Sequence, residues 1–175
     1  MEKLTHIDSR GHAVMVDVSD KEETTRTARA GGTISMSREA LSAVIGGNAP
    51  KGDVLCTARI AGIMAAKKTS ELIPLCHTLM LTKVSIDFEA FEEQSLISAY
   101  CTVKLKGRTG AEMEALTGVS TALLTIYDML KAIDRSMVIS DIRLLEKDGG
   151  KTGHYIKEDP VDASPGKKKE ISVLL

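Results

Sequence analysis

Residues 115–133 read ALTGVSTALLTIYDMLKAI and contain only two charged side chains, Asp128 and Lys131. A segment that is apolar nearly all round is typical of a helix buried in a protein core. Burying an ion is costly unless the ion is paired or used, and these two groups lie three residues apart on one side of the helix. We therefore expect the pair to be either a structural ion pair or part of an active site.

Two runs of alternating apolar and polar residues precede this helix. Val84, Ile86 and Phe88 alternate with polar residues, and the apolar residues between 97 and 105 do the same. A short polar link joins these two runs, so they predict an antiparallel hairpin ahead of the helix. After the helix, residues 138–146 predict a further strand.

The first third of the chain predicts strands and two capped helices. Residues 24–36 predict a strand, and the valines at 14, 16 and 18 predict a short earlier one. Each helix follows a residue that commonly caps helix N-termini: 38–45 follows Ser37, and 54–66 follows Asp53.

The order of these elements predicts the fold class. From residue 24 onward it is strand, short helix, helix, strand, strand, helix, strand. This order predicts an α+β protein, a ferredoxin-like βαββαβ sandwich with an inserted helix, in which an antiparallel sheet packs against helices. We expect a single domain over residues 12–153, a loose N-terminal segment at 1–11, and a flexible C-terminal tail at 154–175 that contains prolines and a run of lysines.

Composition gives no reason to expect nucleic acid or a membrane as partner. The net charge is −1, Trp is absent, and only two Phe and three Tyr are present, which disfavours nucleic acid and anionic membranes as partners. Three cysteines without CxxC spacing indicate reduced thiols in a cytoplasmic protein. The first residues form no apolar signal segment, and the apolar helix is interrupted by Gly118, by Ser and Thr, and by its two charges, so we expect no membrane span.

Several polar residues outside the long helix admit two interpretations. Arg26, Lys51 and Lys67 lie near turns or near the ends of predicted helices and strands. Cations at such places either stabilise the C-terminal end of a helix dipole or bind phosphate. His77 lies in an apolar stretch and is more often a satisfied core residue than a catalyst. Cys76 beside it lacks a second ligand at metal-binding spacing, so we expect no metal centre.

The acidic residues that open the long helix raise a question of distance. Glu112 and Glu114 suit the dipole at a helix N-terminus, so capping is the simpler interpretation. On a straight helix Glu114 and Asp128 would lie roughly 21 Å apart. One small-molecule pocket in one chain can hardly reach both. If both are catalytic, the pocket is shared between subunits or the ligand is long, and we favour an oligomer.

Five segments point to a family. They are KGDV at 51–54, ARIAGIMAAKKT at 58–69, IPLCH at 73–77, EMEAL at 112–116 and LTIYDM at 124–129. Together they resemble the molybdenum cofactor biosynthesis protein C family, the cyclic pyranopterin monophosphate synthases, over about residues 12–153. The resemblance implies a lyase that converts 3′,8-cyclo-7,8-dihydro-GTP, supplied by an upstream radical enzyme, into cyclic pyranopterin monophosphate and pyrophosphate.

The resemblance also implies an assembly and a site. The family forms a homo-hexamer, a trimer of dimers, with sites at dimer interfaces, and it requires no protein-held cofactor; Mg²⁺ is an optional companion of the triphosphate or pyrophosphate. Matched by position, the implied catalytic residues are Asp128, Lys131 and Lys51. The implied substrate-binding residues are Leu75, Cys76, His77, Met113, Glu114, Glu112, Lys67 and Arg26. Thr78 stands where the family usually has proline, which could loosen the loop that carries His77.

Two other functions stay open on the residues alone. A ferredoxin-like module could bind RNA or a regulatory nucleotide without catalysis. Modules of this shape that bind RNA stack bases on aromatic side chains of the sheet, whereas the exposed positions of this hairpin offer Tyr100 but mostly Ser, Thr, Asp and Lys. Alternatively, Asp128 and Lys131 could simply be a buried ion pair in a structural oligomer. The synthase is the hypothesis that gives a role to all of these residues together: Lys51, His77, Glu114, Asp128 and Lys131.

Overall fold

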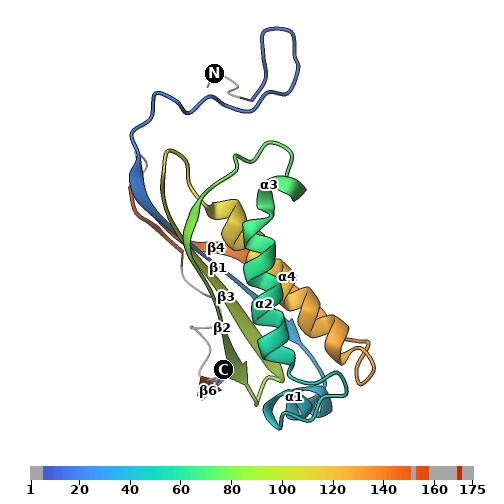
Figure 1. The fold of residues 1–175 in the computed structure, drawn as a ribbon. Coiled ribbons are helices and arrows are strands. Elements are labelled where there is room, and N and C mark those ends of the chain that lie inside the picture. The colour runs from blue at the N-terminus through green and yellow to red at the C-terminus, as the bar shows by residue number, and fades with distance from the viewer. Residues whose placement is uncertain (1–5, 151–152, 158–168, 171–175) are drawn as a thin grey trace.

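A computed structural model describes residues 6–150, 153–157 and 169–170. Its sheet runs in the order β5-β4-β1-β3-β2-β6, and every neighbouring pair is antiparallel. The four long strands are β1 (Thr24–Ser35), β2 (Leu81–Phe91), β3 (Leu96–Gly107) and β4 (Val138–Asp148). Their order, β4-β1-β3-β2, with helices on one face, confirms the predicted ferredoxin-like α+β sandwich (Figure 1).

The helices also follow the predicted order. They are α1 (Arg38–Ile45), α2 (Val54–Lys67), α3 (Thr69–Leu72) and α4 (Glu112–Leu130). The side chain of Ser37 accepts a hydrogen bond from the Ala40 N–H at 3.2 Å, and that of Asp53 accepts one from the Cys56 N–H at 2.9 Å. Both predicted N-caps are therefore confirmed. The single-turn α3 was not predicted.

Helices α2 and α4 lie side by side across one face of the sheet and enclose the core with it (Figure 1). The two helices approach each other closely at Gly62 and Gly118. A Cβ added to Gly62 would lie only 2.9 Å from the Gly118 carbonyl oxygen, so a larger residue would push the helices apart. The start of α2 lies near the end of α4 through a contact of Lys51 with Asp128. The two helices are therefore antiparallel, and the end of α2 lies near the start of α4.

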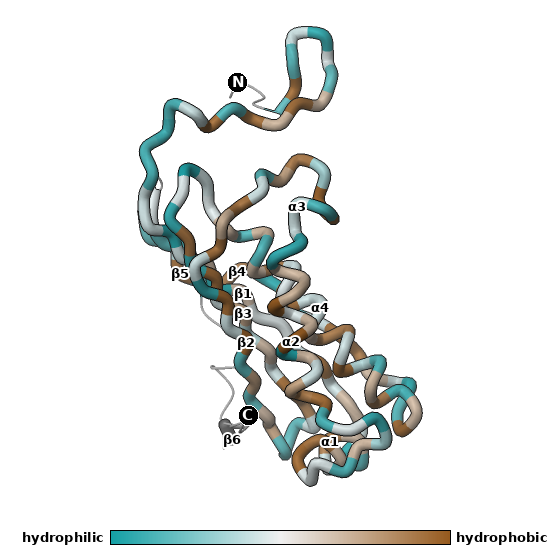
Figure 2. The backbone as a smooth tube through the Cα atoms, viewed as in Figure 1, coloured by the Kyte–Doolittle hydropathy of each residue, from teal (hydrophilic) through white to brown (hydrophobic). Residues whose placement is uncertain are grey.

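The prediction that α4 is buried all round is wrong. Leu124 is 60% exposed, and on α2 the side chains of Ile60 and Met64 are exposed as well. Figure 2 shows hydrophobic residues along both helices, although the sheet covers only their inner sides. The fold has one helical layer, and among the described residues none covers the outer face of that layer at these side chains.

The expected strand at the valines 14, 16 and 18 is also wrong. The segment joins no strand: it leaves the sheet at the end where β1 begins (Figure 1), and the nearest bridge is an isolated one between Ile7 and Ala13. At the other end of the chain, β5 (Tyr155–Ile156) pairs with β4, and β6 (Lys169–Glu170) pairs with β2. Residues 1–5, 158–168 and 171–175 lie outside the described residues, so the loose N-terminal segment and flexible tail stay predictions.

Candidate active site

Three predicted catalytic residues meet at the C-terminal end of α4. The Lys51 ammonium donates to Asp128 Oδ2 at 2.7 Å and to the Asp128 carbonyl oxygen at 3.0 Å. The Lys131 ammonium lies 2.7 Å from Asp128 Oδ1. One carboxylate therefore bridges two lysines, one from the loop before α2 and one from the end of α4.

This cluster is on the surface and not in the core. The side chains of Lys51, Asp128 and Lys131 are 45%, 55% and 53% exposed, so the expectation that the pair is buried in the core of the chain is wrong. The physical reason is position: Asp128 lies in the last turn of α4 and Lys131 just beyond it, where the helix leaves the sheet. Hydrogen bonds from Lys131 and Lys51 lower the pKa of Asp128 to about 2, so its carboxylate stays ionised at neutral pH.

A second cluster lies at the opposite end of α4. Here a hollow of about 320 Å³ is formed by the loop before β2, the N-terminal segment and the first turn of α4. His77 Nε2 lies 2.7 Å from the Val16 carbonyl oxygen, a contact that fixes the imidazole ring. Six of the predicted substrate-binding residues line this hollow: Leu75, Cys76, His77, Glu112, Met113 and Glu114.

Glu114 is a buried carboxyl in the lining of this hollow. It is only 4% exposed, and desolvation raises the pKa of its carboxyl, with a smaller contribution from the charge of Glu112. Burial, and then the charge of Glu114, raises the pKa of the Cys76 thiol. The hollow therefore favours neutral forms of both groups, which suits a site that exchanges protons with a bound ligand.

Replacing Glu114 with Gln is expected to raise the melting temperature at pH 7. The folded chain holds the Glu114 proton more tightly than the unfolded chain does, so stability falls as pH rises from the ordinary value of 4.5 through the raised pKa. The rise in melting temperature should disappear below pH 4.5, the ordinary pKa of the carboxyl, and thermal melts at several pH values measure it. Glu112→Gln is the control and should show no gain, since Glu112 is ion-paired with Lys147. A less stable Glu114→Gln protein at pH 7 would contradict the assignment.

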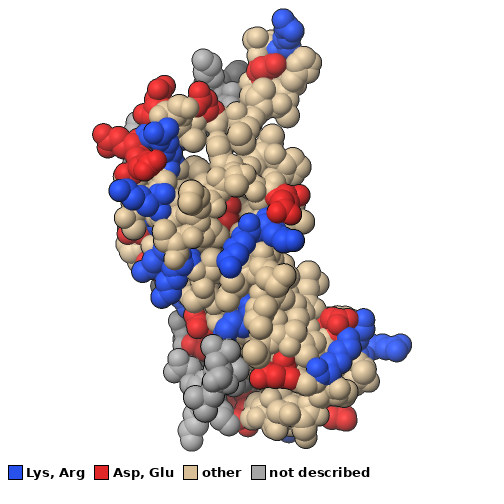
Figure 3. All heavy atoms as spheres, in the orientation of Figure 1, with Lys and Arg blue, Asp and Glu red and all other residues tan. Residues whose placement is uncertain are grey.

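A larger hollow of about 710 Å³ adjoins this one and contains Arg26. Arg26 donates from Nε to the Gly107 carbonyl oxygen at 2.9 Å and from Nη2 to the Arg108 carbonyl oxygen at 3.1 Å. Lys147 Nζ lies 2.6 Å from Glu112 Oε1. Figure 3 shows Lys, Arg, Asp and Glu side chains gathered at the end of the sheet where β1 begins. Lys21, Arg108 and Lys147 also line the hollow and were not singled out from the sequence.

Lys67 stands apart from both clusters. It is exposed at the end of α2 and lines a separate groove beside β2, together with Ile63 and Leu79. Leu79 also lines the His77 hollow, so the groove and the hollow are neighbours. The structure therefore gathers the predicted residues at the two ends of α4, with Lys67 near the N-terminal end.

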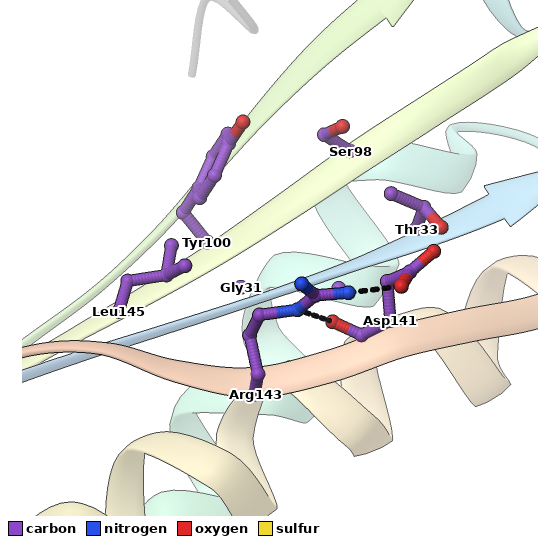
Figure 4. A pocket seen from close by; sticks show the side chains of 8 residues that line it. Gly31, Thr33, Ser98, Tyr100, Asp141, Arg143 and Leu145 are labelled. Carbon is purple, nitrogen blue, oxygen red and sulfur yellow. Dashed lines mark hydrogen bonds and ion pairs between the residues drawn. The ribbon is translucent and has the colours of Figure 1, made fainter. Parts of the chain in front are cut away.

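The open face of the sheet contains a small hollow without any predicted site residue. Figure 4 shows Tyr100, Ser98 and Thr33 around it, with the guanidinium of Arg143 bonded to Asp141. Its volume is about 10 Å³, enough for one water molecule. Among the described residues, no three His, Cys, Asp or Glu side chains group as metal ligands. No described helix is long and apolar enough to cross a membrane.

Comparisons with known proteins agree on one family. The model of the MoaC family matches residues 15–150. A protein of Brucella ovis named cyclic pyranopterin monophosphate synthase is 57% identical over 158 residues, which are 90% of this chain and 96% of the relative. A protein of the same name from Heliobacterium modesticaldum is 57% identical over 159 residues, 91% of this chain and all of the relative.

Proposed function

The chain belongs to the MoaC family, and on that premise we propose that it is a cyclic pyranopterin monophosphate synthase of molybdenum cofactor biosynthesis. Its substrate would be 3′,8-cyclo-7,8-dihydro-GTP, supplied in the cytoplasm by an upstream radical enzyme, and its products cyclic pyranopterin monophosphate and pyrophosphate. The observation that carries the proposal is 57% identity over nine-tenths of the chain with relatives of that name.

The three residues at the C-terminal end of α4 would carry the proton transfers. Opening a purine-derived ring and reclosing it as a pterin requires protons to be removed and returned, which lysine and carboxylate side chains can do. Asp128 holds the ammonium groups of Lys51 and Lys131 on its two oxygens, 2.7 Å from each. Two acid–base groups held on one ionised carboxylate support a catalytic role for all three.

The second half of the reaction would use cations. Forming the cyclic phosphate makes one ester bond to the α-phosphorus and breaks the bond to pyrophosphate, so negative charge develops on the leaving group. Arg26 and Lys67 are the cations that we assign to the phosphates, and Mg²⁺ would arrive only with the triphosphate or leave with the pyrophosphate. Leu75, Cys76, His77, Glu112, Met113 and Glu114 would bind the rest of the substrate.

An antiparallel contact between two copies of α4 would join the two clusters. The outward side of the helix presents Met113, Thr117, Leu124 and Asp128 in one stripe, and Met113 and Leu124 are 37% and 60% exposed. A two-fold axis near Ser120 and Thr121, midway along this stripe, would place Met113 of one chain beside Asp128 of the other. We therefore propose composite sites at a two-fold interface within a hexameric trimer of dimers.

The proposed activity is tested by supplying enzymatically made 3′,8-cyclo-7,8-dihydro-GTP and measuring both products. The expected result is cyclic pyranopterin monophosphate and pyrophosphate in equal amounts. Pyrophosphate without the pterin would indicate a phosphohydrolase, and the absence of both products would overturn the proposal.

Arg26→Ala or Lys67→Ala is expected to raise the KM for the substrate about tenfold at low ionic strength, the scale of one lost charge-assisted contact. The ratio of variant to wild-type KM should fall as salt is added, because salt screens the attraction between these cations and the phosphates. Steady-state kinetics at several salt concentrations measure it. The control is Lys104→Ala, an exposed lysine on β3 outside the site. An unchanged KM in both variants would remove these cations from the phosphate site.

A further inference from the structure

The guanidinium of Arg26 is held on two of its three nitrogens. Nε and Nη2 donate to the carbonyl oxygens of Gly107 and Arg108, at 2.9 and 3.1 Å. A guanidinium has five N–H donors in a fixed plane, so these two bonds set the direction of the remaining nitrogen, Nη1. Among the described residues, no acceptor is bonded to Nη1. Arg26 therefore has a fixed orientation, in which the N–H groups of Nη1 are available to a ligand.

The turn after β4 passes directly over this nitrogen. Gly149 and Gly150 both have positive φ angles, +95° and +82°, which side chains other than glycine rarely adopt. A Cβ added to Gly150 would overlap Arg26 Nη1 and would lie 3.0 Å from Cζ. Gly150 and Arg26 also line the same hollow, together with Lys147 and Arg108. The lack of a side chain at position 150 is thus what leaves the guanidinium in its place.

We infer that Gly150 is a positioning residue for an oligophosphate, acting through Arg26. By leaving room for Nη1, it keeps the guanidinium in one orientation, in which Nη1 and the remaining N–H of Nη2 can bind phosphate oxygens. The inference rests on the proposed function for the identity of the natural ligand, a nucleoside triphosphate derivative or its pyrophosphate product. The residue itself contributes no group to the ligand.

The hollow is not simply a cationic patch, and this strengthens the argument for orientation. Lys21, Arg26, Arg108 and Lys147 line it, but so do Asp20, Glu22 and Glu112. Glu112 is paired with Lys147 at 2.6 Å, so that ion pair partly neutralises itself. Attraction by overall charge is therefore weak here, and the binding of an anion depends on how individual donors are aimed.

Gly153 provides a matched control. It also has a positive φ, +70°, but a Cβ added there meets no described atom within 4 Å. Alanine at either position therefore carries a similar backbone strain, and only alanine at 150 displaces Arg26. Because the displaced atom is at the end of a flexible side chain, the Gly150→Ala protein can fold with Arg26 moved.

The experiment is calorimetric titration of the full-length protein with inorganic pyrophosphate. Gly150→Ala is expected to weaken binding about tenfold, the scale of one charge-assisted hydrogen bond, and Gly153→Ala less than about twofold. Arg26→Ala should weaken binding at least as much as Gly150→Ala. Combining Gly150→Ala with Arg26→Ala should add nothing further, because both changes remove the same contact. Thermal melts of the two glycine variants should match.

Several outcomes would overturn the inference. They are a wild-type protein that binds no pyrophosphate at millimolar concentration, equal binding by the two glycine variants, or fully additive losses in the double variant. The proposed function fails separately, through the absence of turnover in the wild type. Pyrophosphate binding that depends on Gly150 in a protein without synthase activity would keep the oligophosphate site and reject the synthase.

Discussion

Replacing Asp128 or Lys131 with alanine is expected to lower kcat at least about a thousandfold, within the range of losing an acid–base group. Removing Asp128 releases the ammonium groups of Lys51 and Lys131 from their shared carboxylate, and removing Lys131 deletes one of the proposed proton carriers. Both changes should leave the fold intact, because exposed ion pairs add little to stability and these side chains are about half exposed.

Kinetics and thermal melting together test this expectation. Product formation from 3′,8-cyclo-7,8-dihydro-GTP is measured for each variant, and its melting temperature is compared with that of the wild type. Lys104→Ala, which removes an exposed lysine elsewhere, should keep wild-type turnover. Near-normal activity of both the Asp128 and the Lys131 variants would make the cluster a surface ion pair and would remove it from the proposed site.

Two inactive variants, Glu114→Ala and Asp128→Ala, are expected to restore activity when their chains share an oligomer. Each mixed two-fold interface would contain one site with both changes and one site with neither. Half of randomly formed dimers are mixed, so about one quarter of wild-type activity should return. This result follows from composite sites alone, because a site within one chain stays damaged in any mixture.

The two variants are co-expressed with different affinity tags, so that oligomers containing both chains can be separated from those containing one. Sequential purification on both tags isolates mixed oligomers, and mass spectrometry confirms that both chains are present. Mixed oligomers without recovered activity would show that each site lies within one chain. An active wild-type monomer in size-exclusion chromatography with light scattering would lead to the same conclusion.

Most of the fold follows from local patterns in the sequence. The hairpin is evident because apolar residues alternate along both β2 and β3, and the helices because Ser37 and Asp53 cap apolar segments. The valines at 14, 16 and 18 alternate equally well but form no strand, since their segment lies beyond the end of the sheet where β1 begins (Figure 1). Alternation describes what a segment can do, whereas pairing depends on whether the rest of the chain places a partner strand beside it.

The site was less accessible to prediction from spacing. The residues Lys51 and Asp128 are 77 positions apart, and their contact depends on the antiparallel packing of α2 against α4. Their shared role came from the family resemblance alone. The pair of Asp128 and Lys131 stood out because two ions in an apolar helix were expected to be buried, but this end of the helix is exposed. Lys147 gave no signal at all, since a lysine near the end of a strand is usually only solvated.

Helix α4 also fixes both the distance and the angle between its two ends. Fourteen residues separate Glu114 from Asp128, and at about 100° per residue they complete nearly four turns, so both side chains leave the helix within about 40° of each other. Inserting one residue between them would turn one end by about 100° and lengthen the span by only about 1.5 Å. If the proposed composite sites use both ends, an insertion or deletion inside this helix is expected to lower activity even where every remaining side chain is unchanged, because it changes the angle between the two ends as well as the distance.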